Sequence, residues 1–249
     1  MTSPSRIVIA FDLYGTLLCT ESIAHELAKI YGEDMAASLA AAWRRHQLEY
    51  TWRMNSMGQY KPFDQITRNA LSHALAEHDQ TLTSDNTTTL MHSYDSLHVF
   101  PEIPKAMQIV KKPDEPVVVV PYIFSNGTES MIANSVQASP ELAPYADIFH
   151  SFITVDDVKC YKPDPRTYAH LIERSKAQDC ESHVWVVSAN AFDIVGARTA
   201  GLKAAFIDRA GKGWVDRLLD EQSEDNIPSL ISSSVKEAIE CIFSYVSTM

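Results

Sequence analysis

The sequence predicts an α/β fold, with a doubly wound parallel sheet as the core and an inserted all-helical domain. Two observations lead to this prediction. Short apolar runs alternate with amphipathic helical patterns in residues 1–20 and 98–249, as in parallel sheets covered by helices on both faces. Residues 21–97 contain helical patterns only. This block separates the first strand from all the others, so we expect it to be a lid over the ligand edge of the sheet.

The predicted strands are short and rich in β-branched and aromatic residues. The first is 7–11, and the second, 117–124, is a longer run that contains Pro121. Since proline has no amide proton to donate, we expect this second strand at a sheet edge or a bulge. Three further strands are predicted at residues 148–154, 184–187 and 204–207.

The predicted helices fall into two groups. The inserted block is expected to contain four, at residues 22–31, 35–57, 63–76 and 84–96. The others alternate with the strands, at residues 103–111, 130–137, 165–175, 193–200 and 235–245. Two proline-bearing stretches, 111–116 and 138–144, are expected to be surface loops.

The composition of the chain argues against several classes of protein function. A net charge of −11 with no basic stretch argues against nucleic acid and anionic membrane surfaces as partners. No apolar run approaches the roughly 20 residues of a membrane span, and residues 1–6 do not resemble a leader. The four cysteines are scattered, without a Cys-x-x-Cys pair, so we expect a reduced cytoplasmic protein.

Polar side chains follow the predicted strands. Asp12 ends the first strand, Ser125 the second, Lys162 lies in a later loop, and Asp193 follows the fourth strand. Taken singly, they have plainer interpretations: a turn cap, a helix cap, a solvated lysine and a helix N-terminal charge. Four such residues at successive strand ends are a rarer coincidence, so we expect them to meet at the carboxyl edge of the sheet.

This set of groups favours nucleophilic chemistry. The Asp12 carboxylate can attack carbon or phosphorus and form a covalent intermediate. An ammonium at Lys162 would hold it ionised, because a nearby opposite charge lowers the pKa of an acid. Backbone amides around Leu13, Tyr14 and Asn126 could cradle a substrate anion.

The same stretches resemble the haloacid dehalogenase superfamily, and within it the L-2-haloacid dehalogenases. The matching segments, which span nearly the whole chain, are 11–17, 43–44, 47–52, 125–127, 161–164 and 188–193. The resemblance implies a Rossmann-like core of residues 1–20 and 98–249 and a helical cap of residues 21–97. It also implies a homodimer that forms through the cap.

Tyr14 separates two activities of this superfamily. Its phosphatases place a second Asp two residues after the nucleophile, which protonates the departing alkoxide. Halide leaves without a proton, so a dehalogenase needs no acid there. Ser188 and Asn190 are likewise neutral where the phosphatases usually carry carboxylates for magnesium, so we expect no metal and no cofactor.

The resemblance implies that Asp12 displaces halide from C2 of a short L-2-haloacid. Water would then hydrolyse the aspartyl ester to a D-2-hydroxy acid, with inversion at C2. Arg44 from the cap and Asn126 would receive the halide, and Ser125 would hold the substrate carboxylate.

The resemblance also implies supporting roles. Lys162 would orient Asp12, and Ser188 would support Lys162. Thr16 and Tyr168 would complete the polar surroundings of the site. Asn190 and Asp193 would position or activate the water that hydrolyses the ester.

The apolar wall of the pocket is expected to include Tyr14, Leu48, Phe63 and Phe192, although such side chains serve equally well as plain helix-packing core. Phe192 stands where the resemblance implies Trp, which would leave room for somewhat bulkier substrates.

Two other functions stay open on the sequence. The first is a magnesium-dependent, phosphatase-like hydrolase, against which Tyr14 argues. The second is a non-catalytic binding protein on the same scaffold, which the loss of Asp12 or Lys162 would indicate, yet both residues are present.

Overall fold

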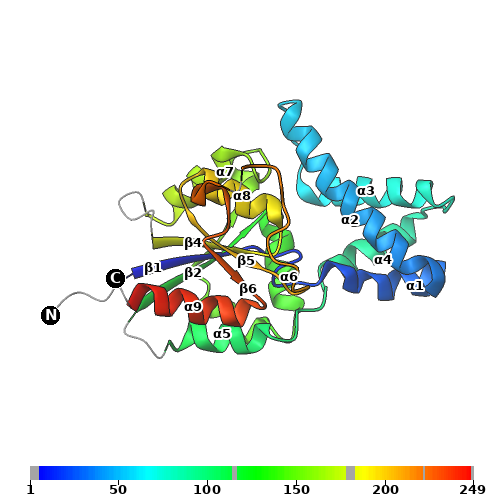
Figure 1. Cartoon of the computed structure of the whole chain (residues 1–249). Coiled ribbons are helices and arrows are strands. Elements are labelled where there is room, and N and C mark those ends of the chain that lie inside the picture. Colours follow the sequence, from blue (N-terminus) through cyan, green and yellow to red (C-terminus); the bar gives the residue numbers. More distant parts are fainter. Residues whose placement is uncertain (1–5, 114–116, 178–182, 221, 248–249) are drawn as a thin grey trace.

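The computed structural model describes residues 6–113, 117–177, 183–220 and 222–247 (Figure 1). The expectations for residues 1–5, for part of the 111–116 loop and for Cys180 therefore lie outside the described residues. Within these ranges, no helix is long and apolar enough to cross a membrane.

A six-stranded, all-parallel sheet forms the centre of the described chain, in the order β3-β2-β1-β4-β5-β6. The strands are β1 (Arg6–Phe11), β2 (Val118–Ser125), β3 (Ser151–Thr154), β4 (Val184–Ser188), β5 (Lys203–Ile207) and β6 (Leu230–Ser232). The order runs in opposite directions on the two sides of β1, which creates a topological switch point at its carboxyl end. Helices lie on both faces of the sheet in Figure 1, so the predicted α/β fold class is confirmed.

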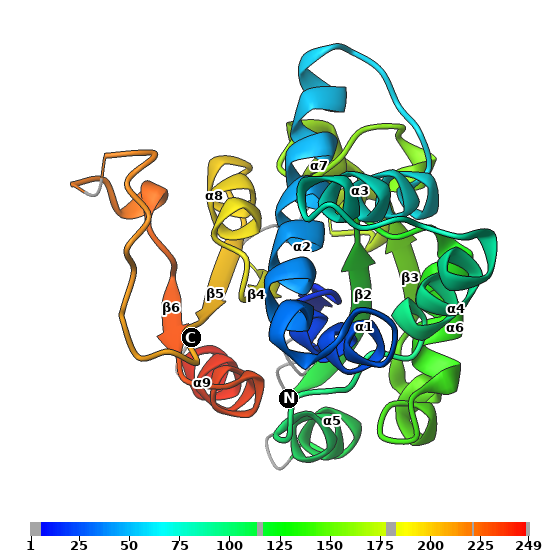
Figure 2. The ribbon, with the colours of Figure 1, turned by 90° about the vertical axis from the view of Figure 1, so that its right-hand side faces the viewer.

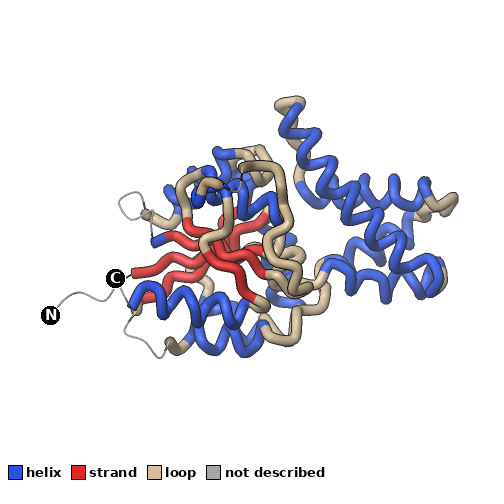
Figure 3. Tube along the Cα trace, viewed as in Figure 1, coloured by secondary structure: helices blue, strands red, loops and turns tan. Residues whose placement is uncertain are grey.

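The core helices pack on the sheet because one face of each is apolar. They are α5 (Ile103–Lys111), α6 (Glu129–Ala138), α7 (Pro165–Arg174), α8 (Ala191–Thr199) and α9 (Val235–Ser247). In Figures 1 and 3, α5 and α9 lie together below the sheet, and α7 and α8 lie above it. The interior residues Ile7, Ile9 and Phe11 of β1 are fully buried as a result.

The inserted block is entirely helical and faces the carboxyl ends of the strands, as Figure 2 shows from that side. Its helices are α1 (Ala24–Tyr31), α2 (Glu33–Ser56), α3 (Phe63–Glu77) and α4 (Ser84–Tyr94). The segment that leads into the inserted block and the segment that leads out of it lie side by side. Backbone hydrogen bonds join Cys19 N to His98 O (2.8 Å) and Phe100 N to Leu17 O (3.2 Å). We propose on this basis that residues 21–97 form the cap domain, and that 1–20 with 98–249 form the core domain.

Pro121 corrects one prediction, because β2 is not an edge strand. It lies between β1 and β3, and Pro121 stands opposite Ile9 of β1. The ladder with β3 begins one residue later, where Tyr122 stands opposite Ser151. The missing amide proton is therefore tolerated where β2 has not yet gained its second neighbour.

Two further differences concern short segments. The strand β6 was not predicted, because three residues carry no readable periodicity. The 138–144 stretch is not a plain surface loop, since Leu142 is fully buried and Ser139 nearly so. The Ser139 hydroxyl accepts a hydrogen bond from Leu142 N at 3.1 Å, which turns the leucine inward.

Candidate active site

Asp12 lies at the switch point, directly after the last residue of β1. Its amide donates to the carbonyl of Val187 at 3.0 Å, and its side chain is nearly buried. The Oδ2 atom accepts three hydrogen bonds, from Thr16 Oγ1 (2.7 Å), Asn190 Nδ2 (2.7 Å) and Ser188 Oγ (3.2 Å). Because three donors fix Oδ2, Oδ1 is the oxygen that can attack an electrophile.

The loop after Asp12 turns back sharply. Gly15 adopts a left-handed conformation, with φ at 88°, which side chains disfavour. The Leu13 carbonyl accepts bonds from the amides of Thr16, Leu17 and Leu18, while the Leu13 side chain is fully buried in the core. The tight turn explains how the Thr16 hydroxyl reaches back to the Asp12 carboxylate.

Lys162 places a buried ammonium between two carboxylates. Its Nζ atom lies 3.3 Å from Asp12 Oδ1, 2.9 Å from Asp193 Oδ2 and 2.7 Å from the carbonyl oxygen of Phe124. All three ammonium protons can thus be used, and only 1% of the side chain is exposed. The lysine fills the position between the two acids.

Asp193 is a fully buried carboxylate with two partners. It accepts a hydrogen bond from the Tyr168 hydroxyl at 2.9 Å in addition to its ion pair with Lys162. Burial raises the pKa of Asp193; Lys162 opposes this effect and the charge of Asp12 adds to it. Burial also raises the pKa of the Tyr168 phenol, so Tyr168 remains a hydrogen-bond donor. A carboxylate with a raised pKa is a suitable acceptor for a proton from water.

The Gly196→Ala variant should disturb this pair without touching either member's chemistry. A Cβ atom at Gly196 would lie 2.6 Å from ring atoms of Tyr168, so the ring would have to move away from Asp193. We expect about 1–3 kcal/mol of lost stability and a lower rate. Urea unfolding and steady-state kinetics measure both, with Tyr168→Phe as the matched variant that removes the hydroxyl and keeps the ring. If Gly196→Ala leaves stability unchanged, the packing described here is wrong.

Ser125 is the last residue of β2 and Asn126 follows it, and both are buried. The Ser125 hydroxyl accepts a hydrogen bond from Gly127 N at 3.1 Å, which leaves its proton available for a ligand. The Asn126 side-chain oxygen accepts one from the amide of Lys162 at 3.0 Å. Asn126 thereby ties the second loop to the lysine loop.

Arg44, on α2 of the cap, reaches the edge of the sheet. Its guanidinium donates to the Tyr14 carbonyl at 3.3 Å and to Asn190 Oδ1 at 3.4 Å. Asn190 in turn bonds to Asp12, so one amide side chain joins the arginine to the carboxylate. The structure therefore brings this cap residue together with the core residues named from the sequence.

Ser188 and Asn190 both contact the Asp12 carboxylate. The Ser188 hydroxyl donates to Asp12 Oδ2 and accepts from Asn190 N at 3.1 Å, and no bond to Lys162 is found among the described residues. Asn190 also donates to the Tyr14 carbonyl at 3.0 Å. Both side chains therefore hold the Asp12 carboxylate directly, because the fourth loop folds over Asp12 rather than over the lysine.

The apolar residues around Tyr14 pack closely. Its ring centroid lies 5.9 Å from that of Phe63 and 5.5 Å from that of Tyr94. Burial raises the pKa of the Tyr14 phenol above its ordinary value. Leu48 is half-buried on α2. Phe192 is half-buried too and makes an edge-to-face contact with Trp52 of the cap, at 5.8 Å.

Gln47 is a site residue that the sequence analysis missed as such. Its Oε1 atom accepts from Arg44 at 2.6 Å and from the Tyr94 hydroxyl at 3.1 Å, and its Nε2 atom donates to Thr67 at 2.7 Å. The side chain is fully buried, so it fixes the direction of the guanidinium. The i,i+3 spacing from Arg44 on one helix was a signal that could have found it.

Arg209 is a second missed residue, from the loop after β5. It donates to the carbonyl of Thr16 at 2.8 Å and pairs with Glu102 at 2.7 Å. Its guanidinium also lies 3.5 Å from the ring centroid of Phe100. Arg209 thereby links the loop after Asp12 to the segment in which the chain returns from the cap, and no local sequence pattern could show a contact over such a separation.

Comparisons with known proteins agree with this geometry. The profile of the family described as haloacid dehalogenase-like hydrolase matches residues 8–201. An (S)-2-haloacid dehalogenase of Pseudomonas sp. (strain YL) is 34% identical over 203 residues, which cover 82% of this chain and 83% of that protein. One from Burkholderia cepacia is 34% identical over 201 residues, covering 81% and 82%.

A solved L-2-haloacid dehalogenase structure superposes with a TM-score of 0.83 at 27% identity, and the match covers 96% of this chain and 99% of that one. The sequence profile, the relatives and the superposition agree over most of the chain's length. The chain belongs to the haloacid dehalogenase-like hydrolase family.

Proposed function

We propose that this protein hydrolyses short L-2-haloacids to D-2-hydroxy acids through an ester on Asp12. The observation that carries the proposal is the Asp12 carboxylate, with Oδ2 held by three donors and Oδ1 beside the Lys162 ammonium, and with Tyr14 rather than an acid two residues later. The (S)-2-haloacid dehalogenases that match most of the chain support the same substrate class.

In the first step, Asp12 Oδ1 attacks C2 of the substrate from the side opposite the halogen. A carbon–oxygen bond forms as the carbon–halogen bond breaks, and halide departs with the electron pair and no proton. Arg44 and Asn126 are the proposed halide acceptors, and Ser125 with nearby backbone amides is the proposed holder of the substrate carboxylate. The backside displacement inverts C2.

In the second step, water attacks the carboxyl carbon of the Asp12 ester and the acyl–oxygen bond breaks. The configuration at C2 is kept, because no bond to C2 changes. Esterification removes the charge of Asp12, so Lys162 and Asp193 then form a neutral pair. Asp193 accepts a proton from the water and returns it to the departing alkoxide, which gives the hydroxy acid, and Asp12 then releases the proton of its new carboxyl group to solvent.

The rate should depend on pH through Asp193. A base must be deprotonated to act, and the pKa of Asp193 is raised by burial, so activity is lost at a higher pH than an ordinary aspartate would give. We expect the acidic limb of the kcat profile to lie above about pH 4. Asp193→Asn should lower kcat about 10²–10⁴-fold and remove that limb. A limb below about pH 4 would contradict this assignment.

Halide release from L- and D-2-chloropropionate, each with EDTA or with magnesium, tests the function itself. We expect halide from the L form only, at the same rate with EDTA. Magnesium-dependent cleavage of a phosphate ester without halide release would instead support the phosphatase-like alternative. Silence in both assays would support the binding-protein alternative.

Substrate size should depend on Phe192. The ring lies against Trp52, so part of the space left by the smaller residue is already filled. We expect Phe192→Trp to lower kcat/KM for 2-chlorobutanoate, relative to kcat/KM for chloroacetate, by roughly 10-fold or more. An unchanged ratio would mean that Phe192 does not limit substrate size.

We also propose assembly as a homodimer through the cap and a cytoplasmic location. The exposed Trp52 and Met57 at the end of α2 support the first, and the free thiols of Cys19, Cys160 and Cys241 support the second.

A further inference from the structure

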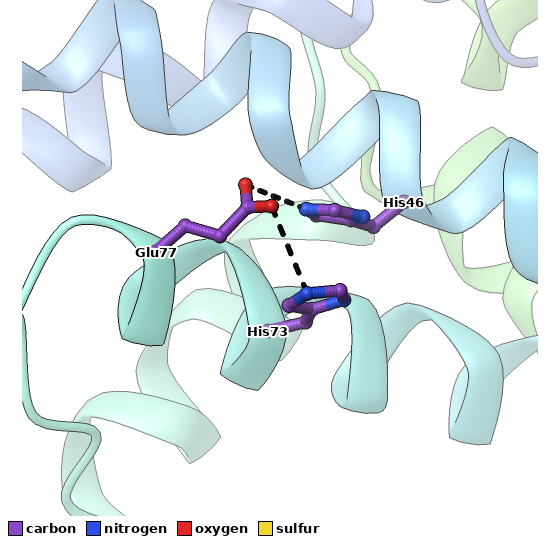
Figure 4. Close-up of side chains that lie close together, drawn as sticks. All are labelled: His46, His73 and Glu77. Atoms are coloured by element: carbon purple, nitrogen blue, oxygen red, sulfur yellow. Dashed lines mark hydrogen bonds and ion pairs between the residues drawn. The ribbon is translucent and has the colours of Figure 1, made fainter.

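Three potential metal ligands meet in the cap, away from the residues around Asp12. His46 lies on α2, and His73 and Glu77 lie on α3 (Figure 4). One ligand atom from each side chain lies within 4.8 Å of the other two. The proposed reaction uses none of these groups.

The helices themselves bring the three side chains together. His73 and Glu77 are four residues apart, so they project from the same face of α3, which packs against α2. His46 Nε2 lies 2.8 Å from Glu77 Oε2, and His73 Nε2 lies 3.7 Å from Glu77 Oε1. The two imidazole rings stack with centroids 3.7 Å apart. Both Nε2 atoms are therefore directed to the same carboxylate.

The second nitrogen of each imidazole has an oxygen-bearing side chain near it. His73 Nδ1 lies 2.7 Å from the Tyr50 hydroxyl, which leaves Nε2 for a ligand. His46 Nδ1 is buried without a hydrogen-bond partner, and the Glu49 carboxylate lies 3.8 Å away. If Nε2 of His46 bound a cation, its proton would move to Nδ1 and face that carboxylate. Carboxylates commonly support metal-bound histidines in this way.

We propose that His46, His73 and Glu77 bind a divalent transition-metal ion, with Zn²⁺ as the best match. Two imidazoles, one carboxylate and a water are a donor set that Zn²⁺ favours in tetrahedral sites. The proposal is independent of the proposed dehalogenation.

Two local adjustments accompany binding. The stacked rings place their lone pairs in nearly parallel planes, so the His73 ring must rotate, and its 38% exposure allows this. The Arg45 guanidinium lies 2.7 Å from Glu77 Oε2 and 3.3 Å from His46 Nε2. The Arg45 guanidinium thus occupies a position that favours a cation. Its side chain is 61% exposed, so it can move into solvent when a metal ion binds.

A bound metal ion would cross-link α2 and α3. Gln47, which orients Arg44, already bonds to Thr67 across the same pair of helices. His46 is the residue before Gln47, so a metal ion bound to His46 would make the part of the cap that carries Arg44 more rigid. It would act on the stability of the cap and take no part in the chemistry at Asp12.

Thermal unfolding and equilibrium dialysis of the EDTA-treated full chain with ZnCl₂ test the proposal. We expect one Zn²⁺ per chain and a melting temperature roughly 5 °C higher at saturation. His73→Gln and Glu77→Gln should each weaken binding at least about 10-fold. His92→Gln, which removes an exposed histidine on α4, is the matched control and should bind as the parent does.

A further variant separates this site from adventitious binding. Arg45→Gln removes the competing cation and keeps all three ligands, so it should tighten Zn²⁺ binding roughly two- to five-fold. The proposal is overturned if the parent chain shows no saturable binding. It is also overturned if His73→Gln and Glu77→Gln bind as the parent does, or if Arg45→Gln weakens binding.

Discussion

The Asp12→Asn variant should release no measurable halide from L-2-chloropropionate, with a rate at least about 10⁴-fold below the parent. An amide oxygen is a poor nucleophile, and no second carboxylate can replace it, because Asp193 is fully buried behind Lys162. The fold should survive, since an amide oxygen can still accept bonds from Thr16, Ser188 and Asn190 at the same position.

The measurement is halide release together with a thermal unfolding curve. Asp147→Asn is the matched control, because Asp147 is an exposed core-domain aspartate paired only with Lys111 among its described contacts. The control should keep full activity. Halide release by Asp12→Asn at a rate close to that of the parent would remove Asp12 from the chemistry and with it the proposed ester.

The Lys162→Met variant should lose both activity and stability. Without the ammonium, the carboxylates of Asp12 and Asp193 stay buried with no cation between them. Breaking a buried ion pair by removing one partner costs about 3–5 kcal/mol. Halide release should fall at least about 10²-fold, because the Asp12 carboxylate is no longer oriented by the ammonium. Urea denaturation gives the change in the free energy of unfolding.

A double variant separates the two effects. Lys162→Met combined with Asp193→Asn removes one of the stranded charges, so it should recover part of the lost stability but none of the activity. The reverse pattern, with activity recovered, would mean that Lys162 acts only as a counterion for Asp193. A stability loss below about 1 kcal/mol for the single variant would contradict the buried triad described here.

Local patterns explain why much of the fold was predictable. The apolar run of β1, the helical block of the cap and the later alternation of strands and helices each depend on residues that are close in sequence. The positions after the strands were predictable for the same reason, since parallel strands must end at one edge of the sheet. Asp12, Ser125 and Lys162 followed from that rule.

Contacts between distant residues account for what was missed. The hydroxyl of Ser188 bonds to Asp12 rather than to Lys162, and only the fold of the fourth loop decides between those partners. Arg209 reaches the Thr16 carbonyl from the loop after β5, which is two strands away from β1 in the sheet. The placement of Pro121 depends on where β3 starts, which the sequence of β2 does not contain.

By itself, the sequence determined the α/β class, the inserted helical block and the position of Asp12 at the end of the first strand, because periodicity and strand ends are short-range properties. The tertiary structure alone decided which oxygen of Asp12 faces Lys162, how Gln47 orients Arg44 and that His46, His73 and Glu77 meet. Those features depend on distances of a few ångströms between side chains on different elements, and packing sets such distances only once the whole chain has folded.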